Sequence, residues 1–401
     1  MSLAKRLLSF STIPAFSALI PFLILPVLSR AAGTEAWVAV GVGQSVGGFL
    51  ALAVSLGLNV TGPTLVSLAA PDERPRMFAR GTRARIALAV PAALVGALVA
   101  AWLAPEKEAL AAALMAVAIT LGGLTASWYL IGLGTPLPLI GFELVPRAAA
   151  TAAGGVIVVL GGPVWSYPVL LIIAVVGGIA AYASRVMSLS DLMRGWRESA
   201  RFARRQLSAA GTETVSGAYT ALAVSLVTMG ASTAQAASYI SGDKLWRIGQ
   251  TVVGAQGNAL QGWVVEDGKA HFGRRIRTAL MLHAVLGAAG FAMFALAGPW
   301  LTGVLFDEPM GVATAVLFGV ATFCLSMTTA LGRHVLIGLG RPRFVFWSVV
   351  AGAVAGVPTT IVLAHSLGAF GGAIGLATAE GVVLLTQLFF AGTLWKSRSR
   401  A

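Results

Sequence analysis

Charged residues are scarce in this chain. Asp, Glu, Lys and Arg make up 11% of its 401 residues, whereas 57% are hydrophobic. A soluble globular domain carries about 25% charged residues, so this composition leaves too few to cover a water-exposed surface. Long apolar stretches recur from one end of the chain to the other, which is typical of transmembrane helices. The sequence therefore predicts an all-α polytopic membrane protein.

Cysteine is nearly absent as well. The single cysteine, Cys324, excludes an internal disulfide and a cysteine-based zinc or iron–sulfur site. The chain has no G-x-x-x-x-G-K-[ST] loop, so we expect that it does not hydrolyse ATP itself. Its polar loops are short and leave no room for a soluble catalytic domain. We therefore expect neither an enzyme nor a cofactor, and no catalytic or metal-binding residue.

About twelve stretches have the length of roughly 20 apolar residues that a spanning helix needs. They cover residues 7–29, 37–60, 85–104, 109–132, 138–161, 163–185, 208–230, 236–262, 278–299, 311–337, 345–365 and 371–394. The first stretch resembles a signal peptide. Its apolar run is too long for one and further spans follow, so we interpret it as the first transmembrane helix.

Basic residues are concentrated in alternate loops, which accounts for the net charge of +13 without a nucleic-acid-binding surface. With a cytoplasmic N-terminus, nearly all Lys and Arg residues of the loops lie on the inner side, as the positive-inside rule requires. This asymmetry needs an even number of spans, so both termini are predicted to be cytoplasmic. The abundance of Arg and Ala indicates a high-GC bacterium. We expect a multi-pass protein of the bacterial plasma (inner) membrane.

A short string occurs twice at equivalent places in this topology. LIGLG ends the fourth predicted span at Leu130–Gly134 and the tenth at Leu336–Gly340. In each copy a single residue separates the last glycine from a proline. A second echo, at 78–88 and 272–282, precedes the third and the ninth spans. The chain therefore contains a parallel internal repeat, which predicts an N-terminal six-helix bundle (1–185) and a C-terminal one (207–401). Both LIGLG copies are predicted to end in tight turns set by glycine and proline.

The segment 186–206 between the two bundles is the longest polar stretch. Its apolar face holds Leu189, Met193, Trp196, Ala200 and Ala203, and its opposite face holds Arg194, Arg197, Arg201 and Arg204. The pattern predicts a basic amphipathic helix that lies on an anionic inner leaflet. A solvated linker helix would show the same pattern. The pairs Gly43-x3-Gly47 and Gly371-x3-Gly375 favour close contact between helices.

Four stretches resemble a known family of transporters. These are Pro21–Pro63, with its LPVLSR string and Gly-x-Glu loop, WYLIGLG at 128–134, YISGDKLWRI at 239–248 and the glycine-rich GAFGGAIGLATAEGVV at 368–383. In order and spacing they resemble the Wzx-type polysaccharide flippases of the multidrug/oligosaccharidyl-lipid/polysaccharide exporter superfamily. The resemblance implies two six-helix bundles around a central cavity and alternating-access export of undecaprenyl-diphosphate-linked oligosaccharide in polysaccharide biosynthesis.

Ionisable residues within the spans are the candidates for function. Each costs about 2.5–3.5 kcal/mol on insertion scales, so it normally faces a cavity. A diphosphate headgroup needs cationic donors, and sugar hydroxyls need polar partners. The predicted substrate-binding residues are Arg147, Lys244, Arg247, Arg333, His334, Gln44 and Gln250. The predicted ion-coupling residues, for H⁺ or Na⁺, are Glu143, Asp243 and Glu380.

Structural roles compete with these assignments. Asp243 with Arg247, and Glu143 with Arg147, are four residues apart and could neutralise each other within one helix. Arg333 could extend to the inner surface, and the glutamines could hydrogen-bond between helices. His283 is interpreted as a packed residue.

Alternative functions also remain at this stage. One is an ion-coupled multidrug or cation antiporter of the same superfamily, and another is a lipid II flippase, for which fourteen spans are expected. A membrane-bound polymerase or glycosyltransferase would need large polar loops. The expected partners are a lipid-linked glycan, membrane lipid and polysaccharide-assembly proteins, but no nucleic acid.

Overall fold

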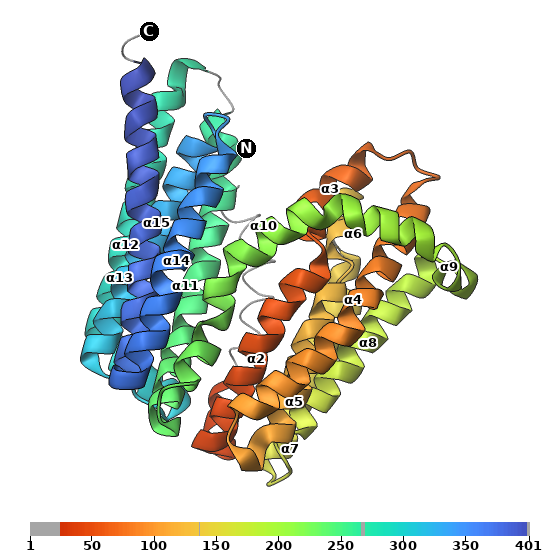
Figure 1. Ribbon diagram of the computed structural model, residues 1–401, viewed down its shortest axis with the longest axis horizontal. Coiled ribbons are helices and arrows are strands. Elements are labelled where there is room, and N and C mark those ends of the chain that lie inside the picture. Colours follow the sequence, from red (N-terminus) through yellow and green to blue (C-terminus); the bar gives the residue numbers. More distant parts are fainter. Residues whose placement is uncertain (1–24, 136, 266–268, 399–401) are drawn as a thin grey trace. The chain divides into compact units, whose positions relative to one another are not determined.

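The computed structural model describes residues 25–135, 137–265 and 269–398 (Figure 1). Within these ranges the chain is helical, with short turns and no β-strand. An all-helical membrane fold was predicted, and this prediction is confirmed. The first predicted span lies mostly outside the described residues, although residues 25–32 are helical.

The first part of the chain forms helices that alternate with short breaks. They are α2 (Thr34–Ser55), α3 (Leu58–Leu68), α4 (Arg74–Leu103), η1 (Glu106–Glu108), α5 (Ala109–Leu121), η2 (Gly122–Leu124), α6 (Ser127–Gly132), η3 (Ile140–Leu144), α7 (Val145–Val159), α8 (Ser166–Val186), α9 (Leu189–Met193) and α10 (Trp196–Thr228). The element η3 is a π-helix, whereas η1 and η2 are 3₁₀ turns.

The second part has fewer and longer helices. They are α11 (Thr233–Val265), α12 (Lys269–Phe306), α13 (Val312–Ala330), η4 (Leu331–Leu336), α14 (Pro342–Leu367) and α15 (Ala369–Arg398), of which η4 is a π-helix. Among the described residues, nine helices are long and apolar enough to cross a membrane. The long helices α10 and α11 fall outside this set. For α11 the reason is composition, because Asp243, Lys244 and Arg247 interrupt its first half and glutamine, asparagine and glycine residues lower the hydropathy of its second half.

The chain divides into two compact units, with the border between Ser225 and Leu226. The sequence placed the division in the linker 186–206, whereas this border falls inside α10. In the unit Val27–Ser225, α5 packs against α2, α4 and α8, and α7 packs along α8. In the unit that starts at Leu226, α13 packs against α12 and α15, and α14 runs beside α15 (Figure 1).

The two LIGLG copies form the same helix terminus. In the first, Thr135 N–H donates to Leu130 O at 3.1 Å and Gly134 N–H to Ile131 O at 3.0 Å. In the second, the matching bonds run from Arg341 to Leu336 and from Gly340 to Ile337, both at 2.9 Å. Gly134 and Gly340 have φ values of 72° and 73°. This is the Schellman arrangement, in which a left-handed glycine closes the helix. The predicted glycine turns are therefore present in both halves.

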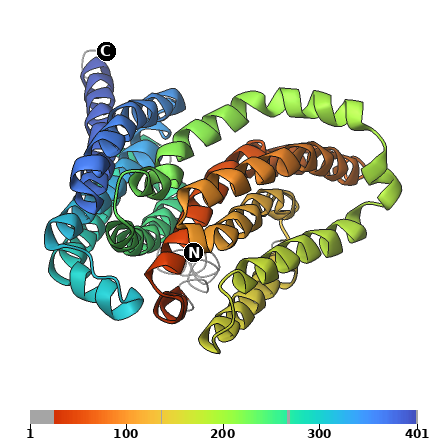
Figure 2. The same ribbon diagram turned by 60° about the horizontal axis from the view of Figure 1, so that its bottom comes forward.

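The linker is not the continuous amphipathic helix that its sequence pattern predicted. The short helix α9 ends at Met193, the chain turns at Arg194 and Gly195, and α10 begins at Trp196. Gly195 has a φ of 82°, a conformation that other L-residues rarely adopt. The prediction of one helix was wrong because it followed side-chain periodicity alone. The helix after the turn, α10, is long (Figure 2).

Glycines allow helices in each unit to approach closely. A Cβ atom added to Gly43 would lie 2.6 Å from Ala112 O, and one on Gly47 would lie 2.6 Å from Ala116 O. The α2 backbone therefore rests directly on α5. In the other unit, a Cβ atom added to Gly371 would collide with the backbone of Leu363, and one added to Gly375 would collide with Thr360, both on α14. Both glycine pairs thus have the close-contact role that their spacing predicted.

This packing generates a prediction with an internal control. Gly43→Ala and Gly47→Ala should each lower the free energy of unfolding by about 1–3 kcal/mol, because the added methyl group overpacks the contact of α2 with α5. Gly48→Ala, in the same helix, meets no atom within 4 Å and should leave stability equal or higher. Thermal unfolding of the purified protein in detergent measures all three. Equal effects at positions 47 and 48 would contradict the packing role.

Candidate functional site

A buried arginine that the sequence did not single out organises the middle of the unit Val27–Ser225. Arg85, on α4, is 1% exposed. Its guanidinium donates to Thr125 O at 2.8 Å and to Gly123 O at 3.2 Å, and it lies 5.4 Å from the centre of the Trp128 ring. Both carbonyls belong to the break between α5 and α6, where the regular helix pattern leaves them without backbone donors. Arg85 therefore satisfies an interrupted helix inside an apolar bundle.

An aromatic cluster encloses this break. The Phe78 ring lies 4.8 Å from that of Tyr129 and 5.7 Å from that of Tyr182, and it stacks on Trp128 at 6.1 Å. All four side chains are buried. A cation that is surrounded by aromatic rings and bonded to carbonyls is a fixed structural element. The sequence gave no sign of this role, because Arg85 lies at the start of a predicted span, close to other basic residues of a loop.

Glu143 reaches the same break from the opposite side. Its carboxylate accepts the Ala126 N–H at 2.8 Å and the Thr125 hydroxyl. Ala126 directly precedes α6, so the carboxylate lies at the positive end of that helix. Glu143 is therefore bound to the N-terminus of α6 in this structure, which is a structural role beside the ion-coupling role predicted for it.

Arg147 does not form an ion pair with Glu143, which was the alternative to its predicted role in substrate binding. Its Nε and Nη2 atoms are buried and have no hydrogen-bond partner among the described residues. Glu143 lies within the π-helix η3, whose wider turn changes the angle between positions four residues apart. A cation with unsatisfied donors is costly in an apolar environment unless an anion or water fills them. Among the predicted substrate-binding residues, Arg147 is therefore the arginine with buried N–H donors that could bind an anionic substrate.

The alternative pairing of Asp243 with Arg247, by contrast, is present in the structure. Arg247 Nε lies 2.7 Å from Asp243 Oδ2, one turn apart on α11. Asp243 and Lys244 are almost completely buried, with 1% and 4% of their surfaces exposed. Arg247 is therefore neutralised within its own helix. Gln250, one turn further along α11, is half-buried.

Arg333 and His334 lie on the π-helix η4 and have different surroundings. Arg333 donates to the side-chain oxygen of Asn258 on α11, which is an interhelical role. The buried His334 ring lies 5.5 Å from the ring of His283 on α12. Both ring nitrogens of His334, and Nε2 of His283, have no partner among the described residues. His283 Nδ1 lies 3.3 Å from Ser326 Oγ.

The sequence interpreted His283 as merely packed and so missed this histidine pair. The two residues are far apart in the chain and share no motif, so only the packing of α12 against η4 brings them together. The remaining candidates are Glu380, buried on α15, and Gln44, half-buried on α2. Gln44, Glu143 and Arg147 belong to the unit Val27–Ser225, and the other seven candidates belong to the unit that starts at Leu226.

Arg85 and Arg147 provide a contrast that can be measured. Arg85→Gln should lower the free energy of unfolding by about 3–5 kcal/mol, because it leaves buried carbonyls unsatisfied and removes the charge opposite Glu143. Arg147→Gln should change it by less than about 0.5 kcal/mol, because no bond to its buried nitrogens is lost. Thermal unfolding in detergent tests both. A loss for Arg147→Gln as large as that for Arg85→Gln would refute the distinction.

No protein-family model matches this sequence, and no curated protein matches it either. Solved structures match it along most of the chain. One is described as an inward-facing multidrug resistance MATE family transporter of the MOP superfamily, with a TM-score of 0.70, 14% identity, and coverage of 96% of each chain. Another is the lipid II flippase MurJ in an inward closed conformation, with a TM-score of 0.72, 12% identity, and coverage of 95% of this chain and 86% of that one.

A eukaryotic MATE transporter, AtDTX14, is also similar, with a TM-score of 0.56 and 16% identity over 97% of this chain. Identities this low establish the fold and leave the substrate open. The nine apolar helices and these matches together show a multi-pass membrane protein. The chain has the helical fold of the MATE transporters and the MurJ flippase.

Proposed function

We propose that this chain is a flippase for a lipid-linked oligosaccharide. In this proposal an undecaprenyl-diphosphate-linked glycan moves from the cytoplasmic to the outer leaflet by alternating access of the two bundles. Two facts support it: the chain has the fold of a lipid II flippase, and it resembles the Wzx-type flippases in sequence. The bacterial inner membrane and cytoplasmic termini belong to the same proposal.

The observation that carries the proposal is the state of Arg147. A guanidinium offers paired donors in the plane that matches phosphate oxygens. In Arg147 the Nε and Nη2 atoms are buried without a hydrogen-bond partner among the described residues. In Arg85 only Nη2 is in this state, because Nε and Nη1 donate to backbone carbonyls, and Arg247 is paired with Asp243. We assign the diphosphate to Arg147 first. Lys244, Arg333 and His334 remain proposed contributors from the other unit, with Gln44 and Gln250 as partners for sugar hydroxyls.

The flipping of a substrate needs a source of free energy. Because no ATP-binding loop was found, we propose coupling to H⁺ or Na⁺ through Glu380 or Asp243. Asp243 is ion-paired with Arg247, so an ion that binds Asp243 would compete with this pair. Glu143 is the weaker candidate, because its carboxylate is bound to the start of α6.

The first test is transport by the purified protein in liposomes. A fluorescent undecaprenyl-diphosphate oligosaccharide placed on one leaflet should appear on the other, and Arg147→Gln should slow this at least about tenfold, which corresponds to about 1.4 kcal/mol of lost binding. Arg197→Gln removes an exposed arginine of α10 and should have no effect. Normal flipping by the Arg147 variant would remove this residue from the site.

A second candidate function is ion-coupled export of a drug or other organic cation. The observation that favours it is the fold shared with MATE transporters, together with the buried carboxylates Asp243 and Glu380. A cationic dye in the same liposomes separates the two functions. Dye movement without glycan movement would support the cation exporter, and Glu380→Gln should then abolish the response to an imposed pH gradient.

The MurJ resemblance also raises lipid II itself as the substrate. This chain covers 86% of the MurJ chain, which is consistent with the smaller number of spans predicted from the sequence. Lipid II offered in place of the oligosaccharide lipid tests this alternative directly.

A further inference from the structure

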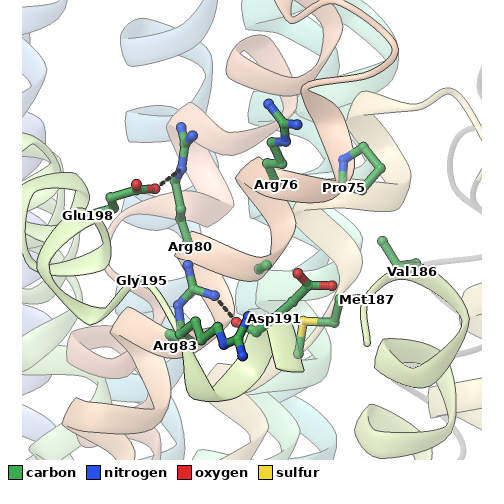
Figure 3. Close-up of a pocket in the computed structure, with 11 residues that line it drawn as sticks. Pro75, Arg76, Arg80, Arg83, Val186, Met187, Asp191, Gly195 and Glu198 are labelled. Atoms are coloured by element: carbon green, nitrogen blue, oxygen red, sulfur yellow. Dashed lines mark hydrogen bonds and ion pairs between the residues drawn. The ribbon is translucent and has the colours of Figure 1, made fainter. Parts of the chain in front are cut away.

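A pocket of about 320 Å³ opens where the start of α4 meets the α8–α9–α10 segment (Figure 3). It belongs entirely to the unit Val27–Ser225 and is separate from Arg147 and Glu143. Its lining residues are Pro75, Arg76, Ala79, Arg80, Arg83, Val186, Met187, Asp191, Arg194, Gly195 and Glu198. Four arginines therefore face two acidic residues in one cavity.

The two acids neutralise only part of this charge. Glu198 pairs with Arg80 at 3.2 Å (Figure 3). The Asp191 carboxylate accepts the Ser188 N–H at 2.9 Å and the Ser188 hydroxyl at 2.7 Å, which cap its own helix α9 and lower the pKa of Asp191. Arg76 and Arg194 have no acidic partner among the described residues, so the pocket keeps an excess of positive charge.

The pocket has a fixed base. Arg83 is 5% exposed, donates to Ser199 Oγ at 2.9 Å and bonds the backbone oxygen of Asp191. Gly195 makes this position possible, because a Cβ atom on it would lie 2.9 Å from Arg83 Nη2. Its φ of 82° also creates the break after which α10 begins. The N-terminus of the long helix α10 adds a partial positive charge beside the arginines.

Two exposed apolar side chains are neighbours, along the chain, of residues that line the pocket. Met193 and Trp196, on either side of Arg194 and Gly195, are 70% and 45% exposed. Exposed tryptophan and methionine beside a basic cluster are typical of a segment that lies at a membrane surface, with the apolar groups among the lipids and the cations at headgroup level. The ligand that combines an anionic phosphate with an adjoining apolar chain is a phospholipid.

We propose that this pocket binds the phosphate headgroup of an anionic membrane phospholipid. The phosphate oxygens accept from Arg76 and Arg194 above the fixed Arg83, and the acyl chains lie along Met193 and Trp196. A bound lipid would hold α9 and the start of α10 against α4. The bound lipid then fixes the linker to the rest of this unit, and this role does not depend on the transported substrate.

The test titrates the full chain, purified in neutral detergent, with phosphatidylglycerol and counts bound lipid by native mass spectrometry. The double variant Arg76→Gln/Arg194→Gln should lower the affinity about tenfold or more, since it removes two charge-assisted donors from the phosphate. Arg201→Gln/Arg204→Gln removes two exposed arginines of the same linker outside the pocket and should keep the wild-type affinity. Gly195→Ala, which displaces Arg83, should weaken binding as well.

Two outcomes would overturn the proposal. Equal losses in the two double variants would show a diffuse attraction by the whole basic linker without a site. The wild-type protein could instead bind inorganic phosphate and show no preference for phosphatidylglycerol over phosphatidylcholine. That result would identify a site for free anions. Thermal unfolding of each variant separates a lost site from a lost fold.

Discussion

The structure depends on one constraint: every backbone and side-chain polar group inside an apolar bundle needs a partner within the protein. The break between α5 and α6 shows how this is met. Arg85 donates to the carbonyls that the end of the first helix leaves open, and Glu143 accepts from the amide that begins the next helix. The two charges thus satisfy opposite ends of one interrupted helix, and the aromatic cluster around Trp128 packs beside the buried Arg85.

The two repeated halves satisfy the polar groups near their equivalent helix ends in different ways. Both end the corresponding helix with a left-handed glycine and the same pair of backbone hydrogen bonds. Before that terminus, however, the first half breaks into η2 and α6, whereas the second continues from α13 into the π-helix η4. A π-turn displaces side chains without opening the backbone, and such turns are frequent at functional sites. In η4 it carries Arg333 and His334, where the first half has Ser127 and Trp128.

The ionisable groups fall into two classes: those that hydrogen-bond to another group of the protein, and those that keep hydrogen-bonding atoms without a described partner. Arg85, Arg247 and Arg333 each bond another group of the protein, and they stabilise it whatever it transports. Arg147 and the pair of His283 and His334 retain buried donors or ring nitrogens without partners among the described residues. Buried groups of this second kind are rare in proteins and call for a ligand, a proton or water. The proposed functions therefore rest on them.

The sequence by itself determined the features that depend on neighbours along the chain. Composition determined the membrane class and the LIGLG strings determined two helix ends, whereas a spacing of four residues made the Asp243–Arg247 pair possible. Only the tertiary structure decided which distant groups meet. Glu143 bonds to Ala126 instead of Arg147, His283 lies against His334, and Gly195 breaks a helix so that Arg83 can enter. Helical periodicity encodes contacts within one element, whereas partners on different elements are set by packing, which a single sequence does not display.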